Sequence, residues 1–584
     1  MPCRYQPKSL LSLSESRVVS NVVYTCYEIQ ELVYSAQTFL FVKNQMRQFW
    51  QLSVPVVIRR RILIKCMNML ADVTREGHSI SPIDTVPLCL LAVMLDKDIV
   101  ELKVQLCCYY GCSHQNAMLR LLASEAKGLE KFELSRSTLL RLDTQLFHSA
   151  LLSMSNLKCL ILKNIACDKL LKIIGLSCFV LEKLDISNSS QVTDEGLKNL
   201  LLQIEIRDKQ KLDKYSIESK GQTITKISLM KILRTLSRKL KTKISGEKVK
   251  IDDMSFILEY CQKSTQLCST MRVLNMANTS ITSLGILLAL KNIPNLENLG
   301  EYCHIGKALE LLDKLTEAKQ LQLTMINACR TTSARLQTLC DSCTRLNRLT
   351  ISEPLHTPNM LSYLPHTLIK INLQSVPVEQ SWVSELYNYF SGSASKKLRE
   401  VFLKFRRNNS SPLIDLSKIL PALSDLEVLS IDNAEIQWIE SPPIGNQQIP
   451  PFKKLQKLQL CNIRDVNTFR VLLRRTPFLK VLHIYSINTE SQSSLIEMLN
   501  EHDDLTKNLD CLYFNELLPS GNPDTLKELV TTCPKINKIG NVANWSGVNR
   551  DEIKDLNEWI QHNNYKLELC AGSHWYCSEC FPIA

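Results

Sequence analysis

The chain has 584 residues, more than one compact core usually covers, so several globular domains or one elongated array of repeats is expected. Hydrophobic residues make up 45% of the sequence and charged residues 22%, a balance that excludes a largely disordered chain. The formal net charge is +12, but the excess lies between Arg207 and Lys250, where fourteen basic residues stand against four acidic ones.

The sequence carries no sign of secretion or of membrane spanning. The amino-terminal residues hold no apolar core followed by a small-residue cleavage site, as a signal peptide requires. The longest apolar run covers residues 86–95, contains Pro87, and is about half the length of a transmembrane helix. Cysteines number 22, and without a secretory signal they predict reduced thiols and a cytoplasmic or nuclear protein.

Residues 1–95 carry no repeat and predict a helical head. An amphipathic run covers residues 18–50, and a second apolar-rich segment starts at Val54. The first unit of a repeat array exposes one end of its core. Helices that cap this end are the simplest role for the head.

A short pattern at the start of the head suggests a further role. Ser9, Leu10, Ser14 and Val18 have the spacing Ser/Thr-Leu-x3-Cys/Ser/Ala-x3-aliphatic, which resembles the elongin-binding box of cullin-ligase receptors. Helical spacing would place Leu10, Ser14 and Val18 on one face, suited to a groove in a partner. The resemblance implies elongin C as a partner of the head.

A second pattern follows in the order that such receptors show. Leu52 and Pro55, with Ile58, Ile62 and Leu63, resemble the proline and helix that come after an elongin-binding box and contact the cullin. The two patterns together imply that the head attaches the chain to a cullin-based ligase.

An F-box is the neighbouring alternative, because Pro55, Ile58, Ile62 and Leu63 also resemble the start of that module. The sequence departs from it downstream, where the expected Cys-x-x-Trp stretch is missing, and the nearby Trp50 lies before the proline. A cap, an elongin-binding box and an F-box that binds its own adaptor therefore all stay open.

Residues 96–201 begin a repeat, which lapses and then resumes over residues 266–550. In each copy an apolar residue is followed by others at +3 and +5, and often at +8 and +10, as at Leu181, Leu184 and Ile186. From Met271 to Ile536 the spacing averages about 26 residues, within the leucine-rich-repeat range of about 20 to 29. The fifteen predicted units start at Ile99, Leu129, Leu157, Leu181, Met271, Leu296, Glu317, Leu346, Leu368, Leu398, Leu426, Leu455, Leu479, Leu509 and Ile536.

The template predicts one short strand and one helix in each unit. Apolar residues two apart point to the same side of a strand, so Leu458 and Leu460 face the core. Segments such as 468–479 and 523–536 have helical spacing and would line the convex side. We therefore expect an α/β leucine-rich-repeat solenoid, a horseshoe similar to ribonuclease inhibitor. The units at Glu317 and Ile536 match only part of the template.

Residues 202–265 interrupt the repeat for about the length of two units and hold most of the basic excess. Block charge of this kind is typical of a solvated loop or a mobile helix. Contact with nucleic acid or anionic lipid through the lysines is the alternative. Few aromatic residues interleave the lysines, so base stacking, and with it a nucleic-acid partner, is not expected.

A cysteine or proline repeatedly precedes the predicted strand. It does so at Cys178, Pro294, Cys343, Pro477 and Cys533. A small apolar thiol can pack where a helix ends, and proline stops the helix. This punctuation, with residues 187–201, resembles the cysteine-containing leucine-rich repeats of ubiquitin-ligase substrate receptors. The resemblance implies a substrate-recognition subunit of a cullin-RING ligase that holds a target protein on its concave face; an interaction scaffold with no ligase role is the alternative.

Residues 551–584 are expected to form a carboxy-terminal cap and a cysteine-rich tail. Cys570, His574, Cys577 and Cys580 fall close together and have the donor types that zinc takes. The segment has one Cys-x-x-Cys pair rather than the usual two. Free thiols are therefore expected, and the four residues are only weak candidates for a metal site.

Signatures of catalysis are missing from the sequence, which contains no HExxH, GxSxG or GxGxxG pattern. The run from Gly300 departs from a phosphate-binding loop, because five residues separate its glycines and Ala308 stands where serine or threonine is needed. The sequence predicts a binding scaffold rather than an enzyme, with no cofactor and no catalytic residue.

Overall fold

A computed structural model of the chain describes residues 4, 9–32, 36–75, 85–106, 109, 111–135, 142–202, 264–315, 320–355, 358–408, 410–439, 451–487, 499, 501–514, 523–544 and 548–570. The predicted basic segment, 207–250, and the tail residues His574, Cys577 and Cys580 lie outside these ranges.

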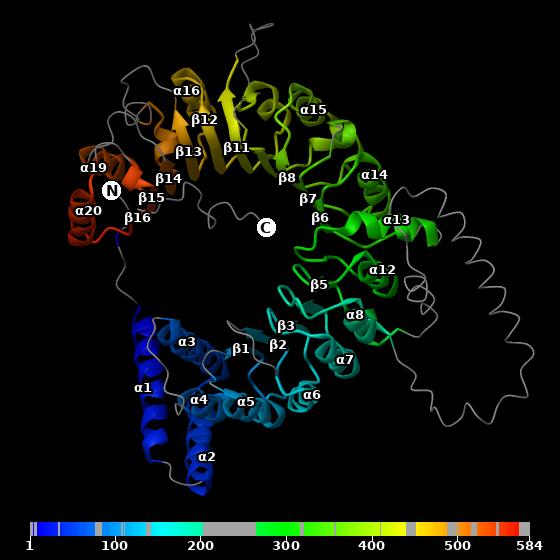
Figure 1. Ribbon diagram of the computed structural model, residues 1–584. Helices are drawn as coiled ribbons and strands as arrows, with labels where there is room; N and C mark the ends of the chain where they lie inside the picture. Colours follow the sequence, from blue (N-terminus) through cyan, green and yellow to red (C-terminus); the bar gives the residue numbers. More distant parts are fainter. Residues whose placement is uncertain are drawn as a thin grey trace, which may run out of the picture.

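The head consists of four helices at one end of the molecule (Figure 1). They are α1 (Leu10–Leu32), α2 (Ala36–Ser53), α3 (Val56–Arg75) and α4 (Val86–Met94). Pro55 separates α2 from α3, and Pro87 lies in the first turn of α4, the positions where proline suits a helix boundary. Helix α4 is buried over nearly its whole length and packs against both α1 and α2. The longest apolar run of the sequence is thus the centre of the head.

Parallel strands and helices alternate along the rest of the chain. The first sheet joins β1 (Glu101–Gln105), β2 (Lys131–Ser135), β3 (Cys159–Ile161), β4 (Lys183–Asp185) and β5 (Val273–Asn275) in chain order. Its helices are α5 (Gly111–Glu125), α6 (Thr144–Ser153), α7 (Asp168–Ser177) and α8 (Asp194–Leu201), with a short α11 (Leu267–Thr270) before β5.

The second sheet has 11 strands, again parallel and in chain order, with β10 paired to β11 off the main path. The strands are β6 (Met325–Cys329), β7 (Arg348–Ser352), β8 (Lys370–Val376), β9 (Glu400–Phe405), β10 (Leu413–Asp415), β11 (Val428–Gln437), β12 (Lys457–Ile463), β13 (Val481–Ile487), β14 (Cys511–Phe514), β15 (Lys538–Gly540) and β16 (Glu568–Cys570). Single bridges through Asn298 connect β5 to β6, so the two sheets continue one another.

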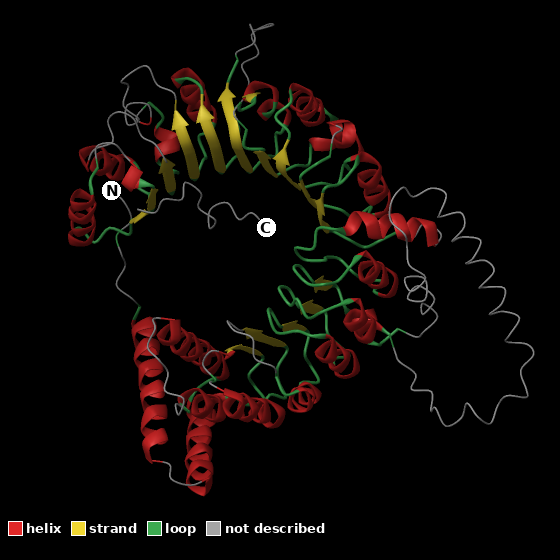
Figure 2. Ribbon diagram, in the orientation of Figure 1, coloured by secondary structure: helices red, strands yellow, loops and turns green. Residues whose placement is uncertain are grey.

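Helices flank the second sheet on its outer side (Figure 2). They are α12 (Ser283–Asn292), α13 (Ile305–Leu315), α14 (Ser333–Ser342), α15 (Gln380–Ser391), α16 (Val466–Arg475), α18 (Asp503–Thr506), α19 (Pro523–Thr532) and α20 (Arg550–His562). The described residues also form short 3-10 helices between the strands and helices. They are η4 (Pro358–Tyr363), η5 (Ser393–Ser395), η6 (Leu416–Lys418), η7 (Leu420–Ala422) and η8 (Val542–Asn544). Figure 1 shows the strands along the inner side of a curved stack and the helices outside.

The predicted register of the repeats is confirmed for most units. Thirteen of the fifteen predicted starts lie two residues before an observed strand, as Ile99 does for β1 and Leu455 for β12. The start at Glu317 is wrong, because β6 begins at Met325 and its unit therefore starts at Leu323. The unit at Leu296 has the bridge at Asn298 in place of a strand. Strand β16, within the predicted cap, adds a unit that the template missed.

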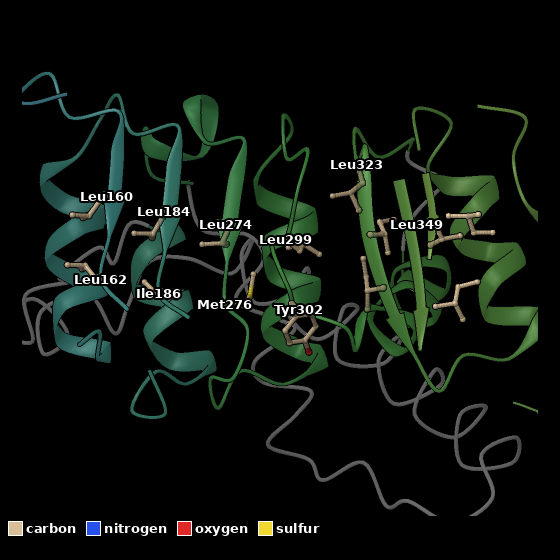
Figure 3. Packing of buried hydrophobic residues seen from close by; sticks show 14 of the residues in the cluster. Leu160, Leu162, Leu184, Ile186, Leu274, Met276, Leu299, Tyr302, Leu323 and Leu349 are labelled. Atoms are coloured by element: carbon tan, nitrogen blue, oxygen red, sulfur yellow. The ribbon is translucent and has the colours of Figure 1, made fainter. Parts of the chain in front are cut away.

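One continuous core runs through the head and all the repeats. The apolar residue at +3 pairs in register with its neighbours, so that Phe132 lies between Leu102 and Leu160, and Leu458 between Leu429 and Leu482. Figure 3 shows Leu160, Leu184 and Leu274 at the same level on successive units. Each such side chain contributes about 1.5–3 kcal/mol when fully buried. Packing of each unit on its neighbours is therefore the main source of stability.

The head is fastened to the first unit by charged groups that are mostly buried. Arg59 of α3 pairs with Asp96, and both side chains are buried. The same guanidinium bonds Asp98 at 2.9 Å, and Lys43 of α2 bonds Glu125 of α5 at 2.8 Å. Because the core also passes from α4 into β1, the head covers the open end of the first repeat.

The Arg59→Ala variant tests this junction. Removing the arginine leaves Asp96 buried without its cation, which costs about 3–5 kcal/mol of unfolding free energy. The expected result in urea denaturation is a lower midpoint for this variant.

The matched control is Lys158→Ala, which removes an ion pair between two half-exposed side chains, Lys158 and Glu130. It should move the midpoint little, since water screens such a pair. Equal midpoints for Arg59→Ala and the unchanged protein would show that the junction does not stabilise the fold.

Candidate interaction surfaces

The inner face of the sheet is built from the residues between the core positions. Side chains alternate along a strand, so those at +2 and +4 of each unit point away from the core. On β1 and β2 they are charged and paired: Lys103 bonds Glu133 at 2.7 Å, and Lys131 pairs with Glu101. Further along, Lys163 lies 3.5 Å from Asp185. Side chains of opposite charge therefore form ion pairs along this part of the inner face.

The inner face of the second sheet is less polar. Phe402, Val481 and Cys511 form a small apolar cluster of their own, apart from the main core. The rings of His483 and Tyr513 lie 5.0 Å apart beside it. All residues of β14 are buried, whereas β1 and β7 alternate between exposed and buried positions. Aromatic and apolar groups therefore collect on the inner face between β9 and β14.

Lys457 and Gln459 alternate with the core leucines of β12, so by spacing alone either could be a variable inner-face position that contacts a target or a residue that holds the strands together. Lys457 is half-buried, but Gln459 is buried and accepts a hydrogen bond from the Ser430 hydroxyl at 3.1 Å. Gln459 therefore holds β11 to β12 in the structure. The sequence could not separate these two roles, because both positions alternate with core leucines in the same way.

The head carries the greatest concentration of exposed apolar side chains among the described residues. Twelve of the twenty large apolar side chains that are exposed lie on α1, α2 and α3. They are Leu10, Leu11, Leu13, Tyr24, Tyr27, Leu40, Phe41, Phe49, Leu52, Val57, Ile64 and Met69. Exposed apolar side chains in this number are typical of interaction surfaces. The sequence patterns named only Leu10 and Leu52 of this set.

The first head pattern lies at the start of α1. The Ser9 hydroxyl accepts a hydrogen bond from the Ser12 backbone N–H at 3.1 Å, which caps the helix. Leu10 is 81% exposed and Ser14 is also exposed, whereas Val18 is half-buried and packs against the core. The exposed part of the pattern is therefore Ser9, Leu10 and Ser14.

The second head pattern divides between surface and core. Leu52 is 79% exposed, and Pro55 is exposed at the corner between α2 and α3. Ile58 is half-buried against the core, and Ile62 and Leu63 are fully within it. The Ile62 and Leu63 side chains are therefore buried by contacts within the head.

Helices α1 and α3 are held together by the Glu15 carboxylate. It bonds Lys65 at 2.5 Å and Arg61 at 2.7 Å. The hydrogen bond from Lys65 is the main reason that the pKa of Glu15 lies below its usual value, and Arg61 adds to it. Glu15 follows Ser14 directly and Leu10 by five residues, so these ion pairs hold the exposed start of α1 against α3.

The buried cysteines of the described residues are protonated core thiols. All sixteen described cysteines, buried or not, are free of disulfides. Burial raises the pKa of the thiols of Cys26, Cys66, Cys178, Cys340, Cys343 and Cys533 to about 12. A thiol with such a pKa stays protonated and is a poor nucleophile. The recurrent cysteines of the repeats thus act as small core residues.

The four weak candidates for a metal site are mostly outside the described residues. Cys570 ends β16, where it is half-buried. Within the described ranges no group of three or more histidine, cysteine or acidic residues is placed to hold a metal ion. No helix in those ranges is both long and apolar enough to cross a membrane.

Comparisons with known proteins identify no family: neither a protein-family model nor a curated protein matches the chain. Among solved structures, a yeast complex of Rad7 and Elc1 is similar at 13% identity and a TM-score of 0.36, over 97% of this chain and 99% of that one. A complex of TLR13 with ssRNA13 has 12% identity and a TM-score of 0.34, over 82% and 67%. A leucine-rich-repeat protein of Leptospira interrogans has 13% identity and a TM-score of 0.30, over 86% and 98%.

Identities and TM-scores this low say nothing about partners or activity. The class of the protein rests on its own repeats: parallel strands in chain order, a helix after most of them, and a buried apolar residue at +3 in register across the units. These features define an α/β solenoid of the leucine-rich-repeat class.

Thiol labelling checks the division between core and surface cysteines. At pH 8 we expect iodoacetamide to modify Cys112, which is exposed, while Cys343 and Cys533 react only after the protein is unfolded. Peptide mass spectrometry of native and urea-unfolded samples measures this. Fast native labelling of Cys533 would contradict its placement in the core.

Proposed function

We propose that the chain is a protein-binding scaffold and, in particular, the substrate-recognition subunit of a cullin-RING ubiquitin ligase. In this proposal the head binds an elongin C-type adaptor and the cullin, and the inner face of a horseshoe similar to ribonuclease inhibitor holds the target. The scaffold itself is not an enzyme, and it works in the cytoplasm or nucleus.

The observation that carries the proposal is the exposed apolar surface of the head. A helix whose only task is to cap a repeat needs one apolar face, turned to the core. Helix α1 has such a face, with Val19, Val22 and Cys26 buried, yet it also exposes Leu10, Leu11 and Leu13. These leucines are the side chains that a groove in a partner would bury.

The exposed start of α1 fits the elongin-binding pattern in its chemistry. Leu10 and Ser14 are one turn apart on the same exposed side, and Ser9 fixes where the helix begins. A leucine beside a small hydroxyl side chain lets a partner helix approach closely and bury the leucine. Val18 would contribute only its exposed part.

The corner between α2 and α3 supplies the second part of the surface. Leu52, Pro55 and Val57 are exposed around this turn, and Val57 is 66% exposed. A cullin contact would use these three residues, since Ile62 and Leu63 belong to the core. The same corner would serve an F-box adaptor if the head were of that kind.

The inner face supports the proposed site for a target. Its apolar cluster of Phe402, Val481 and Cys511 lies beside Lys370, whose ammonium group sits 4.7 Å from the centre of the Phe402 ring. An apolar centre with charged side chains around it is the composition typical of a protein-binding surface.

An interaction scaffold with no ligase role is the second candidate. The buried ion pair of Arg59 and Asp96 favours it. This pair holds the head on the first unit, and covering that unit is a role that needs no further partner. The two candidates share the inner face and differ in whether the exposed leucines of α1 have a dedicated partner.

The Leu10→Asp variant separates the two candidates. Because Leu10 is 81% exposed, the change should leave thermal unfolding unaltered. A charge in a buried leucine pocket would abolish adaptor binding, so we expect elongin C and cullin to be lost from affinity purifications analysed by mass spectrometry.

The matched control is Leu152→Asp, which charges another exposed leucine, 57% exposed, on the outer helix α6. This variant should retain the adaptor. Failure of the unchanged protein to co-purify elongin C or any cullin adaptor would remove the ligase proposal and leave the plain scaffold.

The target site is tested by charge reversal on the inner face. Lys103→Glu on β1 and Arg348→Glu on β7 both alter exposed side chains that point away from the core. We expect one or both to lose specific target proteins while keeping the adaptor. Lys172→Glu, exposed on the outer helix α7, is the control; equal losses there would contradict an inner-face site.

A further inference from the structure

The amino-terminal ends of neighbouring helices are linked by a repeated carboxylate bridge. Asp168 is the first residue of α7, and it accepts hydrogen bonds from the backbone N–H of Thr193 at 2.8 Å and from its hydroxyl at 2.7 Å. Asp194, the first residue of α8, does the same for Thr282. Thr193 and Thr282 are the capping residues of the next helices, α8 and α12. Each bridge thus places one anion between two helix starts.

A glycine makes room for the carboxylate in both bridges. A Cβ atom on Gly196 would lie 2.0 Å from Oδ1 of Asp168, and one on Gly285 would lie 2.3 Å from Oδ1 of Asp194. Both glycines are the third residue of their helix. The missing Cβ of each glycine therefore leaves the space that the carboxylate occupies. The positive ends of the helices favour a negative charge there.

The carboxylate is missing at the next step of the series. Ser283 is the first residue of α12 and takes the place of Asp168 and Asp194. The next helix, α13, again has a glycine near its start, Gly306. A cavity of about 340 Å³ opens here, and both Ser283 and Gly306 line it. Here the Arg335 side chain, and not a carboxylate, lies against the glycine: a Cβ atom on Gly306 would be 3.1 Å from its Cδ.

The wall of this cavity carries basic residues and an unsatisfied hydroxyl. Lys307, Arg335 and His304 line it. Thr331 also lines it, is only 2% exposed, and has a hydroxyl oxygen with no hydrogen-bond partner among the described residues. A buried hydroxyl without a partner is costly, so a ligand that bonds it would be stabilised.

The acidic groups nearby are already engaged. Glu310 accepts the Nε–H of Arg335 at 2.7 Å, a bond that uses one of the five donors of the guanidinium. The Asp194 carboxylate is bound to Thr282, another residue of the cavity wall. Basic side chains from the starts of α13 and α14 therefore line the space.

We propose that this cavity is a binding site for a phosphate group. The space, about 340 Å³, is larger than a carboxylate needs, and its wall holds donor groups from α13, from α14 and from Thr331 before α14, which suits the several oxygens of a phosphate. The group is either inorganic phosphate or the phosphate of a small monoester. The site lies at the helix starts of α12, α13 and α14 and is independent of the head.

Thermal unfolding of the full chain at constant ionic strength tests the site, with inorganic phosphate, phosphoserine and acetate as separate ligands. Phosphate bound to the folded state should raise the Tm, and acetate should do so far less. A response to phosphoserine equal to or above that to inorganic phosphate identifies a monoester as the ligand; a response to inorganic phosphate alone identifies the free ion.

Two variants test whether the Tm response to phosphate arises from binding in this cavity. Ser283→Asp restores the missing carboxylate, so we expect a higher Tm without ligand and no further rise with phosphate. Thr331→Val removes the unsatisfied hydroxyl at nearly the same volume; its Tm without ligand should be equal or higher, and its affinity for phosphate about tenfold weaker.

The control is Thr193→Val in a bridge that is already filled. It should lower the Tm, because it breaks the hydroxyl bond to Asp168, and it should leave the response to phosphate intact. A Tm rise with acetate equal to that with phosphate, or an unchanged phosphate response in Ser283→Asp, would overturn the proposal.

Discussion

The structure depends on the lateral stacking of one apolar side chain per unit. The +3 residues pair in register from Leu102 to Leu274 in the first sheet and from Ile326 to Leu569 in the second. A single short strand with one helix cannot bury its own apolar face, so each unit is stable only between two neighbours. The curved stack, its parallel sheets and its need for covered ends all follow from this.

The ends of the stack meet that need in different ways. At the start, the head continues the core through α4 and is locked by Arg59, a buried cation that fixes its orientation on the first unit. At the other end, β16 adds a last strand, and Arg4 forms an isolated bridge with Tyr565 just before it. A head held this firmly presents its exposed leucines on a rigid base, which lowers the entropy lost when a partner binds.

The same repetition leaves polar positions that vary from unit to unit. The inner face changes from paired charges on β1 and β2 to an apolar and aromatic group around Phe402. At the helix starts, Asp168 and Asp194 fill two equivalent positions and Ser283 leaves the third without a carboxylate. In a repeat protein such departures stand out, because the neighbouring units show what the regular structure would be.

The sequence by itself determined the repeat, since a residue spacing of +3 and +5 is a local property of a strand that packs on one face. It therefore placed most strands correctly. It missed the unit at Leu323, although Ile326 and Ala328 fit the template there, and it missed β16 in the predicted cap. The unit at Leu296 has an isolated bridge in place of the predicted strand. The exposure of Leu10, the burial of Ile62 and the bridge from Asp194 to Thr282, 88 residues away, were decided only by the tertiary structure. These features depend on which elements lie side by side, and no spacing within a single segment encodes that.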